Sequence, residues 1–511
     1  MITHLPLTIW LTTGVALLLG LFLFKRIKVL IQLRHIKGPF ICRVSGIPHM
    51  LAILSGDCHN WYSECNQKYG QITVVSPTVL LTSSPDLWTR MNTHPGYTKS
   101  KWYYRAVRFD WRIDNVFTQM DNEKHDVRRR QMIRGYSGAE NLTLDADIES
   151  CVVKLLNLVR SRYVGRRKMD FAQKMSFYTL DVISTIGFGK TYDLLDKDED
   201  PNEYVKSNHV GLELCNKQVA LGSWWINRIP FLGPKTNLDP DTTKGFYKMT
   251  ALNAAMVEAR EREFNDQKAL GVVPRADMLT SFMRNGISGD DLKAENILQV
   301  IAASDTTAGA IRVIFLYIVT NPRVYKILQA EIDDTVRSGI APRTPEIIKY
   351  TQAKELRYLQ AVIKEAMRIS PPINNPLARD IPPEGDTVVI DGCEIYLPSG
   401  VSIIPSFKAM QRNKSVYGDT DVDVFRPERW LEETDQEKLE AMNHTYNLAF
   451  GHGRWLCLGK AIALRQLGIV IFELFRNFDW TIVSPENPWN IANRMGMFVA
   501  DNMWVQAQER V

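Results

Sequence analysis

The sequence has few of the features that mark a secreted or nucleic-acid-binding protein. Its seven cysteines are an odd number without a C-x-x-C pair, which argues against a disulfide framework or a zinc site and favours free thiols in a reducing compartment. The net charge is only +5, and no Lys/Arg stripe with interleaved aromatic residues occurs, so no nucleic acid partner is expected. What remains is an ordinary globular composition, 45% hydrophobic and 23% charged, over 511 residues.

Charge is also missing near the amino terminus. Residues 5–24 carry no charge, and roughly 20 apolar residues span the hydrocarbon core of a bilayer. Basic residues follow this run and none precedes it, which favours an anchor with the rest of the chain on the cytosolic side. The alternative, a cleaved signal peptide, has a shorter apolar run with its charges in front. We expect a tail and transmembrane anchor in residues 1–24, a basic hinge in 25–40, and one globular catalytic domain in 41–511.

The remaining patterns predict a mainly α-helical fold with a small β part. Short strands are expected at residues 72–75 and 79–82. A β-hairpin is expected where two β-prone runs flank Asp391-Gly392. Long helical patterns fill most of the chain between and after these strands, so the fold class is α+β.

The longest helical pattern, residues 290–321, carries polar residues in an apolar centre. It begins with acidic residues and ends before a proline, and at 1.5 Å per residue it is roughly 45 Å long. Ala302 and Thr306 lie four apart on one stripe, where small side chains leave room for a flat, bulky group. Thr306 can also bond the carbonyl four residues earlier. A buried Asp305 is costly unless it is partnered or moves protons, so a satisfied polar patch and a proton-transfer site are equally well supported.

A second apolar helix is expected at residues 356–372 and holds one acid and one base three positions apart. Glu365 and Arg368 share a face and can pair. On an exposed helix such a pair contributes little to stability. On a buried helix the guanidinium needs a further partner, and Arg429 of the stretch FRPERW is a candidate member of the cluster.

One cysteine lies in an unusual setting, FGHGRWLCLG, residues 450–459. Gly451, Gly453 and Gly459 would let the backbone turn tightly and approach a large planar group. A single thiolate is a soft ligand suited to iron on the proximal side of haem. Cys457 also precedes a long predicted helix, whose positive amino end would lower the pKa of the thiol. The alternative for any single cysteine is an inert core thiol.

Taken in this order, the three stretches resemble the cytochrome P450 family of haem-thiolate monooxygenases over nearly the whole chain. The resemblance implies haem b (iron protoporphyrin IX) with Cys457 as the axial metal ligand. It implies that Asp305 and Thr306 deliver protons to bound dioxygen, and that Glu365, Arg368 and Arg429 form a structural triad. The other residues implied to contact the cofactor are His125, Arg129, Arg379, Phe450, Gly451, Arg454, Trp455, Gly459 and Ala302.

The chain departs from the family pattern in three places. Trp455 stands where an arginine is common, with Arg454 one position earlier, so either Arg454 or the Trp455 indole is expected to contact a haem propionate. His125 stands where a tryptophan is frequent, and the central helix has Ala303 where a glycine is commoner. The run from Cys457 to Ala463 is similar to filamentous-fungal members of the pisatin-demethylase type.

The expected reaction is the insertion of one oxygen atom of O2 into a lipophilic small molecule, in fungal secondary metabolism. No flavin- or nicotinamide-binding region is recognisable, so the electrons would come from NADPH through a membrane-bound NADPH–haemoprotein reductase, with a b-type cytochrome as a possible second donor. The resemblance implies a single-pass protein of the endoplasmic reticulum membrane with a cytosolic catalytic domain. Two alternatives remain open: a haem-thiolate isomerase or dehydratase that needs no external electrons, and a non-catalytic haem-binding sensor.

Overall fold

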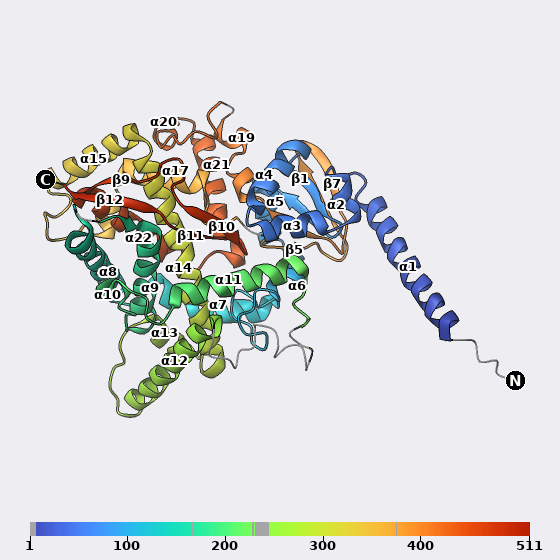
Figure 1. Ribbon diagram of the computed structural model, residues 1–511, viewed down its shortest axis with the longest axis horizontal. Coiled ribbons are helices and arrows are strands. Elements are labelled where there is room, and N and C mark those ends of the chain that lie inside the picture. Colours follow the sequence, from blue (N-terminus) through green and yellow to red (C-terminus); the bar gives the residue numbers. More distant parts are fainter. Residues whose placement is uncertain are drawn as a thin grey trace.

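A helix extends away from one end of the globular body. The computed structural model describes residues 7–165, 167–226, 229, 245–374, 376–418 and 420–510. Helix α1 (Leu7–Gln32) has 26 residues and points away from the body (Figure 1). It continues past Phe24, so the first part of the expected hinge is helical. The first six residues of the expected tail lie outside the described residues, and the anchor stays a prediction.

The β part consists of four small sheets. The largest has the strand order β1-β2-β8-β5-β3, in which β2 pairs in parallel with β8. The predicted strands at 72–75 and 79–82 are confirmed as β1 and β2. The predicted hairpin is confirmed as β6 and β7, and Asp391 and Gly392 have φ angles of 51° and 75°, which two-residue hairpin turns require. The strands are β1 (Ile72–Ser76), β2 (Val79–Thr82), β3 (Thr98–Lys99), β4 (Met169–Asp170), β5 (Arg379–Asp380), β6 (Asp386–Ile390), β7 (Cys393–Leu397), β8 (Ser402–Pro405), β9 (Phe478–Ile482), β10 (Asn490–Arg494), β11 (Met497–Asp501) and β12 (Trp504–Glu509).

Helices make up most of the body, as the sequence predicts. The longer ones are α3 (Ile47–Ser55), α4 (Cys58–Tyr69), α5 (Pro85–Thr93), α7 (Asn122–Ser137), α8 (Leu144–Leu158), α9 (Phe171–Phe188), α11 (Tyr204–Leu221), α12 (Phe246–Ala269), α14 (Gly289–Val319), α15 (Pro322–Arg337), α17 (Arg357–Ile369), α21 (Gln436–Asn447) and α22 (Lys460–Asn477). The short ones are α2 (Phe40–Val44), α6 (Lys101–Tyr104), α10 (Leu194–Lys197), α13 (Met278–Arg284), α16 (Tyr350–Ala353), α18 (Phe407–Met410), α19 (Lys414–Tyr417) and α20 (Arg429–Glu432), with the π-helical turn η1 (Val159–Tyr163) and the 3-10 turns η4 (Leu448–Phe450) and η5 (Gly453–Trp455).

Helix α14 runs through the middle of the body and organises the core (Figure 1). Its first turn carries Asp290 and Asp291, which complement the helix dipole, and Pro322 follows its end. It packs against α9, α12, α17 and α22. By length and composition α14 is also apolar enough to cross a membrane, but 72% of its most apolar stretch is buried inside the protein. It is therefore a core helix, and the sites below lie along it.

Candidate functional site

The loop that carries Cys457 is shaped by two glycines. Gly451 has a φ of 78°, and a Cβ there would lie 2.5 Å from the carbonyl oxygen of Trp455. Gly453 has a φ of 57°, and a Cβ there would lie 2.6 Å from the carbonyl oxygen of Asn92. Any other residue at these two positions would be strained and would clash. Gly459 differs from the expectation, because its φ of −80° is open to every residue and no tight turn requires it.

The environment of the Cys457 thiol combines opposing effects. Cys457 lies three residues before Lys460, the first residue of α22; protein atoms surround it, yet its side chain is accessible. Burial raises the pKa of Cys457, while the backbone N–H groups of Gly459 and Lys460 and the charge of Arg129 lower it. The expected net lowering is therefore wrong for the protein chain alone, because desolvation of the thiolate outweighs the helix amides. The amides do point at the sulfur, as expected, and would stabilise a thiolate once a metal ion shares its charge.

A second accessible region lies at the centre of α14. Residues on both sides of the centre are buried, but Ala302 is exposed and Thr306 is half-exposed. The Thr306 hydroxyl donates to the carbonyl oxygen of Ala302 at 2.6 Å, which confirms the predicted backward bond. The small side chains of this stripe therefore leave open space beside an otherwise closed core helix.

Asp305 faces a different neighbour, helix α11. Its carboxylate is 2% exposed and accepts a hydrogen bond from Asn208 Nδ2 at 2.5 Å. His209 Nε2 lies 3.5 Å from the other carboxylate oxygen. The sequence reasoning did not find Asn208 or His209, since they lie about one hundred residues away and carry no local motif.

Three cations gather near the Cys457 loop. Arg379 and Lys99 are 2% and 4% exposed, and Arg129 is half-buried. Arg129 Nη1 donates to the carbonyl oxygen of Leu456 at 2.6 Å, and the Arg379 guanidinium lies 4.1 Å from the centroid of the Trp455 ring. The charges of Arg379 and Arg129 both help to lower the pKa of Lys99, although burial contributes most. Lys99 is a member of this cluster that the sequence reasoning missed.

These cations have no anionic partners among the residues that the structure describes. No described carboxylate forms an ion pair with Lys99, Arg129 or Arg379, whose hydrogen bonds go to uncharged oxygen atoms. Trp455 Nε1 is buried and has no hydrogen-bond partner. Unpaired buried cations are costly, so the cluster suits an anionic group from outside the chain. Its position beside an accessible thiol fits a planar cofactor with two carboxylates.

The two other residues expected near that group behave differently. His125 is buried, and burial followed by the charge of Lys99 lowers its pKa to about 4, so it is neutral at neutral pH. Its Nδ1 lies 2.9 Å from Asp126. Arg454 also faces Asp126, at 3.7 Å. Of the two residues considered for the family's arginine position, Trp455 therefore has the free donor and Arg454 already has an acidic partner.

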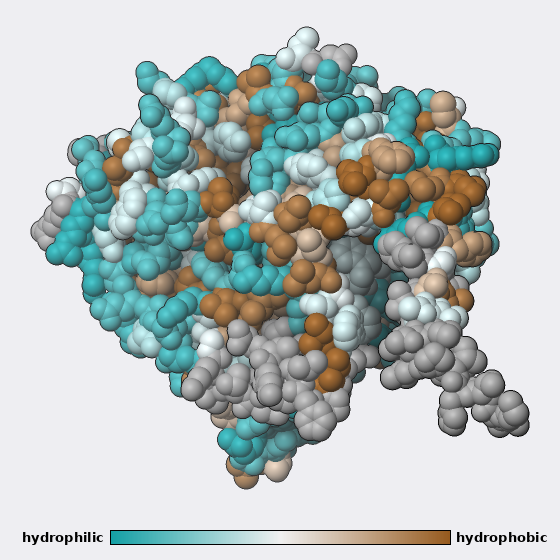
Figure 2. All heavy atoms as spheres, turned by 45° about the vertical axis from the view of Figure 1, so that its right-hand side comes forward, coloured by the Kyte–Doolittle hydropathy of each residue, from teal (hydrophilic) through white to brown (hydrophobic). Residues whose placement is uncertain are grey.

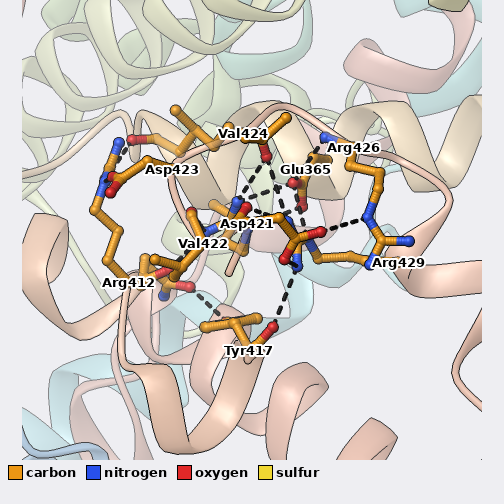
Figure 3. Close-up of polar contacts among 12 residues, drawn as sticks. Glu365, Arg412, Tyr417, Asp421, Val422, Asp423, Val424, Arg426 and Arg429 are labelled. Atoms are coloured by element: carbon orange, nitrogen blue, oxygen red, sulfur yellow. Dashed lines mark hydrogen bonds and ion pairs between the residues drawn. The ribbon is translucent and has the colours of Figure 1, made fainter. Parts of the chain in front are cut away.

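Glu365, Arg368 and Arg429 come together as one buried network (Figure 3). Arg368 donates twice to Glu365, at 2.9 Å each, and Arg429 Nε donates to it at 2.9 Å. Both guanidinium groups also bond backbone carbonyls of residues 411–424. Trp430 Nε1 also donates to Glu365 at 2.9 Å. This partner was not predicted from the sequence, although Trp430 follows Arg429 directly. The third partner expected for a buried pair is thus present, with additional ones.

A family model described as "Cytochrome P450" matches residues 43–503. The chain belongs to the cytochrome P450 family. A protein named cytochrome P450 monooxygenase ABA1 from Pyricularia oryzae is 35% identical over 86% of this chain and 84% of its own length. Cytochrome P450 monooxygenase aba1 from Botryotinia fuckeliana is 28% identical over 93% and 92% of the two chains, and pisatin demethylase from Fusarium vanettenii is 25% identical over 90% and 85%.

Membership defines the enzyme class and the cofactor. The P450 fold is mainly helical with small sheets, as the structure has it, and the resemblance to this family and to fungal members is confirmed. The enzyme is a P450 monooxygenase, whose cofactor is haem b bound through a cysteine thiolate. Its reaction uses O2, a small-molecule substrate and a redox partner.

Proposed function

We propose that this P450 inserts one oxygen atom of O2 into a lipophilic small molecule, with Cys457 as the thiolate ligand of the haem. The observation that carries the assignment is the accessible Cys457 thiol in the glycine-shaped loop, with two helix amides directed at its sulfur. The overall change is R–H + O2 + NADPH + H⁺ → R–OH + H2O + NADP⁺. When bound, the haem supplies dioxygen binding and O–O bond cleavage, which a thiolate ligand favours.

The chain's own residues would hold the cofactor by charge. Arg129, Arg379 and Lys99 provide the cations for its two propionates, and the unpartnered Trp455 indole adds a neutral donor. Neutral His125 would lie beside this group without adding charge. Phe450, Gly451 and Gly459 would shape the thiolate side, and Ala302 the opposite side, where a larger side chain would narrow the accessible space.

Asp305 and Thr306 would deliver protons on the α14 side of the cofactor. Thr306 presents a hydroxyl at the accessible stripe, and the adjacent Asp305 is the nearest acid in sequence. Glu365, Arg368 and Arg429 would keep the thiolate side rigid and take no part in bond making. These roles follow from buried carboxyl chemistry: a fully bonded acid stays fixed, and a sparsely bonded acid can change its protonation state.

The electrons would come from NADPH through a membrane-bound reductase, and a b-type cytochrome is a second candidate donor. Attachment of both partners to the endoplasmic reticulum membrane would keep them close. Helix α1 supports this attachment, and exposed apolar side chains follow it on α2 and α3: Phe40, Ile41, Ile47 and Leu51 are 54–76% exposed. Brown patches gather on the face turned towards α1 (Figure 2).

The relatives named above indicate the substrate class. They are fungal, and one is named for the demethylation of pisatin. We infer a lipophilic substrate of fungal secondary metabolism on this basis.

Replacing Cys457 by alanine tests the assignment. We expect the variant to lose the red-shifted ferrous–CO Soret band and all NADPH-driven oxidation, because no other residue would supply a thiolate to the iron. Cys393→Ala is the matched control, since Cys393 is also exposed but lies in the hairpin strand β7. A normal CO spectrum in Cys457→Ala would contradict the proposal.

The anchor has its own test. Protein in isolated membranes should resist extraction by alkaline carbonate when full-length, and should be extracted when residues 1–24 are deleted. If carbonate extracts the full-length protein too, the exposed apolar side chains hold it only at the membrane surface and α1 does not span the bilayer.

A further inference from the structure

Asp305 cannot exchange protons with solvent directly. Its side chain is 2% exposed, and it projects towards α11, which covers it. Each turnover nevertheless takes up two electrons and two protons at the oxygen, R–H + O2 + 2 e⁻ + 2 H⁺ → R–OH + H2O, because NADPH releases its own proton at the reductase. A residue that delivers these protons has to be recharged from water. A second group must therefore connect Asp305 with the surface.

Most of the polar groups around Asp305 are unsuited to this task. Asn208 Nδ2 donates both to Asp305 and to Ser304 Oγ at 3.2 Å, but a carboxamide does not titrate. The Ser304 hydroxyl is buried and donates to the carbonyl oxygen of Ile301 at 3.1 Å. These contacts orient the Asp305 carboxylate, but they do not connect it with solvent by groups that can carry a proton.

His209 has the properties that the connection requires. Its Nε2 is buried, lies 3.5 Å from Asp305 Oδ1 and makes no hydrogen bond within the described residues. The side chain as a whole is 25% exposed, so the accessible part of the ring lies away from Nε2. An imidazole can accept a proton at one nitrogen and release another from its second nitrogen. His209 thus bridges a buried acid and solvent.

We propose that His209 relays protons from solvent to Asp305 during turnover, an inference that rests on the proposed proton-delivering role of Asp305. A proton from water binds the exposed side of the ring, and the Nε2–H proton passes to Asp305 Oδ1. Asp305 then releases its proton towards Thr306. Neighbouring residues on a helix point about 100° apart, so the carboxyl group has to rotate around α14 between the two steps. Two such cycles supply the two protons that leave with the second oxygen atom as water.

His209 acts through Asp305, so the test compares a reaction that needs delivered protons with one that does not. The probe is 7-ethoxycoumarin, oxidised by the full-length enzyme either with NADPH and reductase or with hydrogen peroxide. Peroxide brings its own oxygen atom, electrons and protons: R–H + H2O2 → R–OH + H2O. His209→Gln keeps the side-chain bulk and removes the titratable ring, and Lys206→Gln, an exposed position on the same helix, is the control.

For His209→Gln we expect the NADPH-driven rate to fall about tenfold. This loss is smaller than that from removing a general acid, because water can partly replace the imidazole ring. The peroxide-driven rate should match that of Lys206→Gln. The solvent deuterium isotope effect on NADPH consumption, which needs no product, should rise. A merely structural role of His209 would lower both rates together and leave the isotope effect unchanged.

Asp305→Asn separates the two hypotheses. If Asp305→Asn lowers the NADPH-driven rate and spares the peroxide-driven rate while His209→Gln changes neither, the relay is wrong and the role of Asp305 stands. If neither variant changes the ratio of the two rates, the proposed proton delivery by Asp305 fails and the relay fails with it. Equal losses of both rates in His209→Gln would likewise overturn the relay.

Discussion

Two buried carboxylates, one on α17 and one on α14, have very different surroundings. Glu365, on α17, is fully buried and accepts five hydrogen bonds, from Arg368 twice, Arg429, Trp430 and the backbone of Arg426. Asp305, on α14, is almost as buried, but among the described residues it accepts one hydrogen bond, from Asn208. Its contact with His209 is longer, at 3.5 Å.

The difference separates a fully bonded acid from a sparsely bonded one. Five donors hold the Glu365 carboxylate in one geometry. Its two arginines in turn bond the backbone of residues 411–424, which fixes the segment packed beside α17 (Figure 3). Asp305 retains unused lone pairs and one longer contact, to the imidazole of His209, which fits the proton delivery that we propose for it.

We expect the largest loss of stability and of haem when Glu365, the carboxylate with five donors, is replaced. Glu365→Gln leaves Arg368 buried without an anion and leaves Arg429 with Asp421 as its one acidic partner among the described residues, and breaking such a buried pair costs about 3–5 kcal/mol. We expect a sharply lower thermal midpoint and loss of haem on purification, measured as the haem-to-protein ratio. Asp305→Asn should retain haem, because Asp305 accepts only one hydrogen bond among the described residues and its loss breaks no such network.

Glu432→Gln serves as the control for Glu365→Gln, because Glu432 also pairs with an arginine, Arg426, but is 62% exposed. A surface pair of this kind contributes about 0–1 kcal/mol. If Glu365→Gln binds haem and unfolds like Glu432→Gln, the bonding around Glu365 does not hold the thiolate side together.

The sequence predicts one side of this comparison better than the other. The E-x-x-R spacing and the segment around Arg429 are local signals, and a buried helix forces the cluster to close, so the triad was expected and is present. The centre of α14 was equally recognisable from its interrupted apolar run. The partners of Asp305 were not recognisable: Asn208 and His209, on α11, approach Asp305 only in the folded chain, and no spacing in the sequence indicates that contact.

The electrostatics were harder to predict than the geometry. The position of Cys457 before α22 was read correctly, but the desolvation that raises its pKa depends on how many atoms of distant segments surround it. The same is true of Lys99, which no motif marks and which becomes buried because β3 pairs with the strand of Arg379. Helix ends and turns can be found locally, whereas burial of a charge is a property of the finished fold.

A third buried carboxylate, that of Glu295, has more hydrogen-bond donors than Asp305 and fewer than Glu365. It is on α14 and fully buried; Oε1 accepts from Arg128 Nη1 at 2.9 Å and from the backbone N–H of Val116 at 2.8 Å, and Oε2 has no partner. Burial raises its pKa to about 7, against the opposing charge of Arg128. With two donors it is bonded more fully than Asp305 and less fully than Glu365.

The smallest expected effect is a pH dependence of stability, which follows from the raised pKa of Glu295. Folding favours the protonated Glu295, so between pH 4.5, the value for a free carboxyl, and about 7 the native state binds more protons than the unfolded state. The contribution of Glu295 to stability is therefore fully present below pH 4.5 and is lost as the pH rises through 7, by about 3 kcal/mol at most. Glu295→Gln keeps an oxygen for Arg128 and Val116 and removes this dependence.

The thermal midpoint of the wild type should accordingly fall relative to that of Glu295→Gln as the pH is raised from 5 to 8, at one fixed scan rate. Arg128→Met should shift the decline to higher pH, because the guanidinium charge that favours ionised Glu295 is gone. Parallel pH profiles of wild type and Glu295→Gln would mean that Glu295 is held in one charge state with only two donors. The number of donors around a buried acid would then not predict whether that acid can change its protonation state.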